Sequence, residues 1–253
     1  MKAIILAAGI GKRFTPPSPP QSEGKGGGLP KCLIEIQGQT LLERTLSALG
    51  AAGVDRAVVV IGYRGEMVED RIGTRCGGVQ VSYITNPRYD RGAILSLWSA
   101  REEFDDDLLI MDADVLFPTA MLRRLIASPQ PNCFLLDTSA SNTGEEQMLL
   151  TRGGRVLTII RGGSGDYDLI GESIGFLKLG RSDAPLLRTI LDDHIARGQD
   201  TIEHEEVYPI FLRQRFVGFE RVEDLPWIEI DFPQDLERAE REVLPRIVAL
   251  DQS

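Results

Sequence analysis

The chain has 253 residues, a length at which one α/β domain with a sizeable hydrophobic core is ordinary. Its hydrophobic content of 42% and charged content of 26% indicate a globular protein. The formal net charge of -10 would repel the phosphates of a nucleic acid, so we expect no nucleic-acid partner, whereas a divalent cation fits the acidic balance.

The N-terminal apolar segment is too short for a secretory signal, and no stretch approaches the roughly 18 apolar residues of a membrane span. The cysteines, Cys32, Cys76 and Cys133, are odd in number, and their spacing suits neither a zinc site nor a disulfide framework. We therefore expect reduced thiols in a cytoplasmic protein without a membrane span. The sequence says little about oligomeric state and leaves a homodimer open.

The first predicted element is a buried strand, residues 3–6, which is short, apolar and β-branched. A turn of small residues follows, so that a bulky anion can approach the backbone N–H groups closely. Lys12, Arg13 and Lys31 add positive charge to the same region. This combination predicts a phosphate-binding edge, although two glycines alone are also compatible with a plain tight turn. The small residues are Ala7, Ala8, Gly9 and Gly11.

Two common nucleotide-binding motifs do not fit this turn. A dinucleotide fingerprint requires Gly or Ala where Phe14 stands, and a Walker A loop requires Ser or Thr where Arg13 stands. The next segment, Phe14 to Leu29, is rich in Pro and Gly and cannot form a helix or a strand. It is either an inert surface loop or a mobile flap over a triphosphate.

Strands and helices then alternate along the first half of the chain. A capping box of Thr40 and Glu43 begins a helix that ends near Gly53. This alternation predicts parallel strands with helices on both faces and a ligand site beyond the carboxyl ends of the strands. Further strands are expected at residues 57–61, 79–84, 108–111 and 134–136, and further helices at residues 66–72, 94–104 and 121–126.

The second half has a different pattern. Gly153-Gly154 separates two apolar runs, residues 148–150 and 156–160, as in a β-hairpin. A strand at 173–179 and helical stripes at 186–195 and 207–212 follow, and a closing helix is expected over 234–249 after Pro233. We find no linker, so we expect one domain over residues 1–253.

Two acidic segments are candidates for metal binding. Asp112-Ala113-Asp114 follows a predicted strand, and residues two apart in an extended segment project to one side, so both carboxylates could bind one Mg²⁺. A solvated acidic turn is the plainer alternative. Glu229 and Asp231 similarly share one face of an alternating segment, although Asp231 could simply cap the helix that follows.

One ordered string of residues resembles the start of the nucleotidyltransferases that make activated sugars and alcohols. Their pattern is Leu-Ala-Ala-Gly-x-Gly-x-Arg followed by Pro-Lys. The resemblance implies a three-layer α/β/α Rossmann-like nucleotidyltransferase fold (GT-A-like) with a mixed, mostly parallel central sheet. The matching residues are Leu6, Ala7, Ala8, Gly9, Gly11, Arg13, Pro30 and Lys31.

Two further segments resemble the phosphocholine cytidylyltransferase branch. Glu229-Ile230-Asp231 is similar to a Glu-Ile-Asp segment whose Asp is the second metal ligand, whereas sugar nucleotidyltransferases more often hold Asn there. Asn86 and Tyr89, followed by Ser96-Leu97, resemble the base-recognition region. The chain departs from the pattern in its longer loop after Arg13 and in Val115, where cytidylyltransferases often have Asn.

The resemblance implies a Mg²⁺-dependent reaction of CTP with a small phosphorylated alcohol, giving a CDP-alcohol and pyrophosphate. Asp114 and Asp231 would bind the metal, Arg13 would steady the pyrophosphate, and Lys31 would contact the α-phosphate or the acceptor phosphate. The attacking phosphate is already ionised at neutral pH, so no general base is required. This suits a chain whose two histidines, His194 and His204, lie outside the motifs.

The resemblance also implies two halves, residues 1–137 for the nucleotide and residues 138–253 for the acceptor. Aromatic and carboxylate groups in the second half could hold an ammonium group or hydrogen-bond the hydroxyls of inositol or a sugar. We expect phosphocholine-like, aminoalkyl phosphate or phosphonate, or inositol phosphate acceptors. The predicted nucleotide-binding residues are Leu6, Ala7, Ala8, Gly9, Gly11, Lys12, Arg13, Gly62, Asn86, Gly92, Ala93, Ser96 and Asp112, and the acceptor-binding residues are Lys31, Tyr167, Glu172, Trp227 and Glu229.

Other functions remain possible at this stage. A sugar-1-phosphate nucleotidyltransferase could use UTP, GTP or CTP. An Asp-x-Asp glycosyltransferase would account for Asp112 and Asp114 but expels no pyrophosphate, and a non-catalytic nucleotide-binding regulator would not need Asp114, Asp231 and Lys31. His204-Glu205 resembles the start of a metalloprotease helix, but Tyr208 stands where the second His is required.

Overall fold

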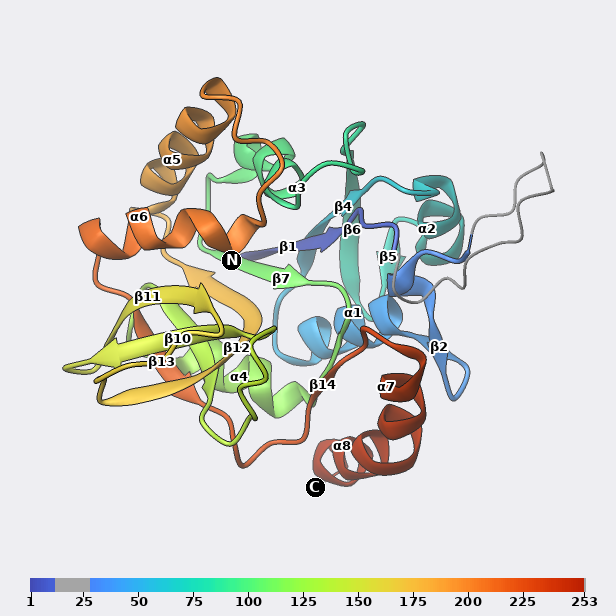
Figure 1. Ribbon diagram of the computed structural model, residues 1–253. Coiled ribbons are helices and arrows are strands. Elements are labelled where there is room, and N and C mark those ends of the chain that lie inside the picture. Colours follow the sequence, from blue (N-terminus) through green and yellow to red (C-terminus); the bar gives the residue numbers. More distant parts are fainter. Residues whose placement is uncertain (12–27, 253) are drawn as a thin grey trace, which may run out of the picture.

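The computed structural model describes residues 1–11 and 28–252 (Figure 1). The predicted cations Lys12 and Arg13 lie outside the described residues, as does most of the predicted loop from Phe14 to Leu29.

The centre of the fold is a set of parallel strands. β1 (Lys2–Ala7) lies between β4 (Arg56–Ile61) and β7 (Leu108–Asp112), and β6 (Val79–Thr85) lies beyond β4. All of these neighbours are parallel, which confirms the prediction from the alternating first half (Figure 1). The carboxyl ends of β1 and β7 therefore lie side by side.

Strands from the second half extend this sheet in antiparallel fashion. β12 (Leu169–Leu179) pairs with β7, and the predicted hairpin continues the edge as β10 (Gln147–Arg152) and β11 (Arg155–Arg161). The long strand β12 also pairs with β9, so one sheet of ten strands spans both halves. The remaining strands of the sheet are β5 (Arg75–Cys76), β9 (Cys133–Asp137) and β13 (Gly218–Arg221).

Helices cover both faces of the sheet, giving the expected three layers (Figure 1). Successive residues of β1 face opposite cores: Ala3 and Ile5 pack on one side and Ile4 on the other, and all three are fully buried. A continuous apolar strand is what such a doubly covered sheet requires. One face carries α1 (Leu41–Ala51), α2 (Gly65–Ile72) and α4 (Thr119–Ala127); the other carries α3 (Ile94–Ser99), α5 (Ala184–Ala196) and α6 (Tyr208–Gln214).

A third hydrophobic cluster lies under the C-terminal segment. It includes Ile36, Leu116, Ile228 and Ile247. Two small antiparallel ribbons contribute to it, one of β2 (Glu35–Ile36) with β3 (Gln39–Thr40), the other of β8 (Val115–Leu116) with β14 (Ile228–Glu229).

The closing helix is not continuous, so the prediction of one helix over 234–249 was wrong in detail. It consists of α7 (Pro233–Arg238), a π-helical turn η4 (Ala239–Val243) and α8 (Leu244–Asp251). Pro245 has no N–H group and cannot complete an α-helical hydrogen bond to the preceding turn. The wider turn accommodates the proline without ending the segment.

The predicted helix over 94–104 is also two elements, α3 and the 3₁₀ turn η2 (Arg101–Glu103). The predicted capping box of α1 is confirmed, because Glu43 N donates to Thr40 Oγ1 and Thr40 N donates to Glu43 Oε2. Two further 3₁₀ turns, η1 (Lys31–Leu33) and η3 (His204–Val207), were not predicted, and both border the cleft described below.

None of the described helices combines the length and the apolar character needed to cross a lipid bilayer. All three cysteines are free thiols, as predicted, with Cys32 and Cys133 buried.

Candidate active site

A cleft of about 1320 Å³ opens at the carboxyl edge of β1 and β7. Its walls come from the turn after β1, the end of β7, β12, β14 and η3, which is the location predicted for a ligand. Among the described residues, twelve carboxylates and four cations line it. This excess of negative charge favours bound cations over a bare polyanion.

At the centre of the cleft, one ammonium group joins two distant carboxylates. Lys31 Nζ donates to Asp114 Oδ2 at 2.7 Å and to Asp231 Oδ1 at 2.6 Å. Burial of the ammonium would lower its pKa, but the charges of Asp114 and Asp231 outweigh burial and hold the pKa of Lys31 above its usual value. The structure thus brings together three of the four residues that the sequence assigned to the reaction centre, and the fourth, Arg13, lies outside the described residues.

The small ribbon of β8 and β14 is what places Asp231 beside Asp114. Glu229 pairs with Val115 in this ribbon, and Ile230 N donates to Asp114 O at 3.0 Å. The two metal-ligand candidates are therefore registered against each other by backbone hydrogen bonds. Register in such a pair decides which side chains meet.

Asp231 is not the cap of the following helix, so the plainer alternative for it is wrong. The N-cap position of α7 is Phe232, and the carboxylate of Asp235 accepts from the backbone N–H groups of Asp231 and Phe232. Asp235 therefore satisfies the helix start, and the side chain of Asp231 is directed to Lys31 instead.

The donors around this point suit a hard divalent cation. Carboxylate oxygens of Asp114, Glu229 and Asp231 lie within 4.8 Å of one another. Asp114 Oδ1 is buried and has no hydrogen-bond partner among the described residues. Burial, followed by the charges of Asp114 and Asp231, raises the pKa of Glu229 to about 8. An all-oxygen set with one unsatisfied buried oxygen fits Mg²⁺.

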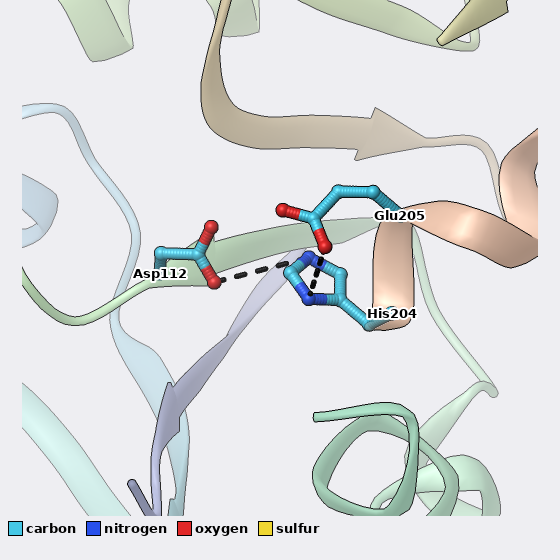
Figure 2. Close-up of side chains that lie close together, drawn as sticks. All are labelled: Asp112, His204 and Glu205. Atoms are coloured by element: carbon cyan, nitrogen blue, oxygen red, sulfur yellow. Dashed lines mark ion pairs between the residues drawn. The ribbon is translucent and has the colours of Figure 1, made fainter. Parts of the chain in front are cut away.

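The structure does not bring Asp112 and Asp114 to one cation, which corrects the prediction from their spacing. β7 ends at Asp112 and the chain bends at Ala113 and Asp114, so the alternation of an extended strand stops there. Asp112 instead faces His204 and Glu205, as Figure 2 shows.

Most of the predicted nucleotide-binding residues line the cleft. Gly11 has a φ of +63° and packs closely on Lys31, since a Cβ there would lie 3.4 Å from Lys31 Cβ. A left-handed turn with this close approach is where glycine is needed. The predicted residues that line the cleft are Leu6, Ala7, Ala8, Gly9, Gly11, Ala93, Ser96 and Asp112.

Gly62, Asn86 and Gly92 are not among the residues that line the cleft, and their contact with the nucleotide stays a prediction. A Cβ on Gly62 would lie 2.5 Å from Tyr89 Cβ, and one on Gly92 would lie 2.5 Å from Ile202 O. Asn86 is 1% exposed, and its Nδ2 donates to Ser96 Oγ at 3.1 Å. These residues pack against or hydrogen-bond to neighbours such as Tyr89 and Ser96, which line the cleft. Their sequence pattern does not distinguish this supporting role from direct binding.

The predicted acceptor residues divide in the same way. Glu172, Trp227 and Glu229 line the cleft, and Trp227 Nε1 donates to Asp137 Oδ2 at 2.7 Å. Tyr167 is not part of the lining, and its contact with the acceptor stays a prediction. Its ring lies 5.7 Å from the guanidinium of Arg152, beside the tip of the β10–β11 hairpin.

The carboxylate and imidazole groups of the cleft that the sequence analysis missed include Asp137, Glu146, His204 and Glu205. The adjacent pair His204-Glu205 was considered only as a protease motif. Asp137 carried a detectable signal, because it follows a predicted strand of the sheet as Asp114 does. Glu146 lies just before β10 and carried no signal.

Comparison with known proteins gives one family match. A model of the MobA-like NTP transferase domain matches residues 3–168. CMP-5'-(3-aminopropyl)phosphonate synthase of Streptomyces rubellomurinus is 34% identical over 131 residues, which are 51% of this chain and 20% of that protein. The bifunctional IPC transferase and DIPP synthase of Rubrobacter xylanophilus is 30% identical over 249 residues, which are 96% of this chain and 52% of that protein. The chain thus spans about half the length of this second relative, and a fifth of the first.

Among solved structures, CTP:phosphocholine cytidylyltransferase from Streptococcus pneumoniae has a TM-score of 0.73 at 22% identity, covering 94% of this chain and 97% of that one. At this identity the likeness shows a shared fold, and it confirms the predicted Rossmann-like nucleotidyltransferase architecture.

Proposed function

Because this chain belongs to the MobA-like NTP transferase domain family, we propose that it transfers a cytidylyl group from CTP to a small phosphorylated acceptor and releases pyrophosphate. The observation that carries the proposal is the Lys31 ammonium held between Asp114 and Asp231 beside the glycine-containing turn after β1. Residues 1–137 would bind the nucleotide and residues 138–253 the acceptor, within one domain.

The residues of the chain would position the two substrates and stabilise their charge rather than act as a general base. The acceptor phosphate, with a second pKa near about 6, is already ionised at neutral pH and can attack the α-phosphate directly. Lys31, which remains charged, would contact the α-phosphate or the acceptor phosphate. The turn at Gly9 and Gly11 lets the triphosphate approach the backbone, and Arg13 would steady the departing pyrophosphate.

Mg²⁺ is the proposed cofactor, held by Asp114 and Asp231. When bound, the ion would neutralise charge on the phosphates and orient them for displacement. Glu229 adds a third carboxylate within reach of the same point. The donor set of oxygen atoms and the unsatisfied Asp114 Oδ1 support this assignment.

CTP is favoured by two observations. The segment Glu229-Ile230-Asp231 keeps Asp at the second ligand position, and several relatives are named as cytidylyltransferases, such as 2-aminoethylphosphonate cytidylyltransferase of Lancefieldella rimae. Relatives that use other nucleotides also exist, such as a UTP–glucose-1-phosphate uridylyltransferase of Haloferax volcanii. The assay described below therefore also tests the alternative of a sugar-1-phosphate nucleotidyltransferase.

The part of the cleft lined by Asp137, Glu172 and Trp227 favours a cationic acceptor over a neutral one. Glu172 is partly buried there, and burial, followed by the charges of Glu146 and Asp137, raises its pKa to about 7. Among the described residues no cation forms an ion pair with Glu172 or Asp137, and the indole of Trp227 lies beside them. Carboxylates that lack a cationic partner and lie next to an aromatic ring suit an ammonium group.

We expect Glu172→Gln to raise KM for an amine-bearing acceptor by about tenfold, because a partly desolvated ion pair is lost, while KM for inositol phosphate changes little. For the wild type, KM for the amine acceptor should fall as pH rises through about 7, since the raised pKa leaves Glu172 protonated at lower pH. Steady-state pyrophosphate release between pH 6 and pH 8.5 measures both effects. An equal KM change for charged and neutral acceptors would contradict the role of Glu172.

One assay tests the function as a whole. CTP, UTP and GTP are each combined with phosphocholine, phosphoethanolamine, 2-aminoethylphosphonate, inositol 1-phosphate and glucose 1-phosphate, and inorganic pyrophosphate is measured. We expect the highest kcat/KM for CTP with an amine-bearing acceptor. Turnover confined to UTP or GTP with glucose 1-phosphate would favour the sugar alternative, and no pyrophosphate in any combination would contradict the proposal.

A further inference from the structure

We propose that Asp112, His204 and Glu205 form a second divalent-cation site, distinct from the Asp114–Asp231 site and suited to a first-row transition metal. His204 Nε2 lies 3.8 Å from Asp112 Oδ1, and His204 Nδ1 lies 3.1 Å from Glu205 Oε2. One ligand atom from each side chain can be chosen so that all three lie within 4.8 Å of one another. Figure 2 shows the three side chains turned toward one another.

Two separate segments build this cluster. Asp112 is the last residue of β7, and His204 and Glu205 come from η3 (Figure 2). At the start of η3 the carboxylate of Glu206 serves the backbone, because its Oε1 accepts from Glu203 N at 3.0 Å, while Glu206 N donates to Glu203 O. His204 and Glu205 line the cleft.

The packing around the cluster fixes its parts in place. Ile94 N donates to Ile202 O at 3.2 Å, and Gly92 allows the start of α3 to approach the chain just before η3. On the other side, Gly175 has a φ of +77°, and a Cβ there would lie 2.3 Å from Asp112 Oδ2. This glycine lies where the pairing of β12 with β9 changes register, a feature that often adjusts side chains next to a functional site.

The three side chains lie near the spacing that a metal requires. Zn²⁺ with bonds of about 2.0–2.2 Å holds its ligand atoms about 3.4 Å apart in a tetrahedron. The 3.8 Å and 3.1 Å separations start from the two different ring nitrogens of His204, of which one ion binds only one. With one atom chosen from each side chain, all three atoms lie within 4.8 Å of one another, so the side chains must draw together to bind a common ion. His204 is 4% exposed, while Asp112 and Glu205 both line the cleft, so an ion could enter from the cleft.

Charge also favours a cation at this point. The cluster contains two carboxylates. The ammonium of Lys31, in the same cleft, already donates to Asp114 and Asp231. Among the described residues, Asp112 and Glu205 have no ion-pair partner other than His204, so the negative charge of the cluster has no other compensation. A protonated His204 bridging the two carboxylates would also compensate it, and this is the competing explanation that the test must separate.

The donor set decides the class of metal. Imidazole nitrogen suits Zn²⁺, Cu²⁺, Fe²⁺ and Ni²⁺, whereas the Asp114–Glu229–Asp231 group offers only oxygen, which suits Mg²⁺ and Mn²⁺. The two sites of the cleft should therefore differ in selectivity. Asp112, His204 and Glu205 lie outside the proposed reaction centre, so cation binding there does not depend on the identity of the acceptor.

The chain has only two histidines, which permits a direct test. His194 is an internal control, because it is buried in α5 with Nδ1 in contact with Ile190 O at 2.8 Å. Zn²⁺ is titrated at constant pH into the full chain labelled with ¹⁵N-histidine, without nucleotide, and ring resonances are followed by NMR. We expect saturable shifts of the His204 ring nitrogens and unchanged His194 signals.

Isothermal titration calorimetry with Zn²⁺ measures the affinity of the site. His204→Gln and Glu205→Gln should each weaken binding at this site by at least about tenfold, whereas the control His194→Gln should not. Asp231→Asn should leave the Zn²⁺-dependent shifts of His204 intact, since it alters the other site. Circular dichroism verifies that each variant is folded. Two results would overturn the proposal and favour the bridging imidazolium. One is that the His204 resonances do not shift with Zn²⁺, and the other is that His204→Gln and Glu205→Gln bind Zn²⁺ as tightly as the wild type.

Discussion

Asp114→Asn is expected to reduce cytidylyl transfer by about 10³-fold or more while leaving the protein folded. Asp114 is proposed to hold the cation that neutralises the reacting phosphates, and a bound metal contributes several kcal/mol of transition-state stabilisation. Asn keeps the shape of the side chain but removes the charge. Because the side chain is 24% exposed and one of its oxygens has no partner among the described residues, we expect a change in Tm of only a few degrees.

The measurement combines pyrophosphate release with Mn²⁺ binding followed by electron paramagnetic resonance. Asp231→Asn should behave in the same way, since both carboxylates meet at Lys31. Asp168→Asn is a matched control, because this exposed carboxylate lies outside the cleft and caps Gly153 N, which an amide oxygen can still do. Wild-type turnover in Asp114→Asn would remove the metal assignment.

Lys31→Met should have two opposite effects. Turnover should fall by about 10²-fold or more, because a charge that contacts the reacting phosphates is lost. Mn²⁺ binding without nucleotide should instead become tighter, because the ammonium that donates to both Asp114 and Asp231 no longer competes with the ion. Two carboxylates left without their partner also destabilise the metal-free protein, by about 1–3 kcal/mol at this partial exposure, and Mn²⁺ should restore that loss.

Thermal unfolding with and without Mn²⁺, together with Mn²⁺ titration, measures these effects. Lys178→Met serves as the control, since Lys178 Nζ is also partly buried but donates to the backbone oxygens of Ile126 and Ser128, far from the metal ligands in the fold. It should lower Tm without changing Mn²⁺ affinity. If Lys31→Met bound Mn²⁺ no better than the wild type, the ammonium would not be the competitor of the metal. A Lys31→Met variant with full turnover would remove Lys31 from the reaction centre.

The parts of the fold that the sequence predicted well are those encoded by neighbouring residues. The apolar run of β1, the capping box of Thr40 and Glu43 and the turn at Gly153-Gly154 each depend on residues within a few positions of one another. Glycines near the first turn likewise signal a close approach, which the structure has at Gly11. The pairing of Asp114 with Asp231 was expected only because a resemblance to a known family connected the two segments.

The tertiary structure alone decided which polar groups meet. The alternation around Glu229 and Asp231 does not say which strand this segment pairs with, yet the two-residue ribbon of β8 and β14 sets Asp231 beside Asp114. A bend after Asp112 separates it from Asp114 and turns it toward His204, and packing places Asn86 and Gly92 outside the lining of the cleft. Local periodicity is written in adjacent residues, but contacts between distant segments depend on strand register and on the packing of helices against the sheet, and these are settled only when the whole core forms.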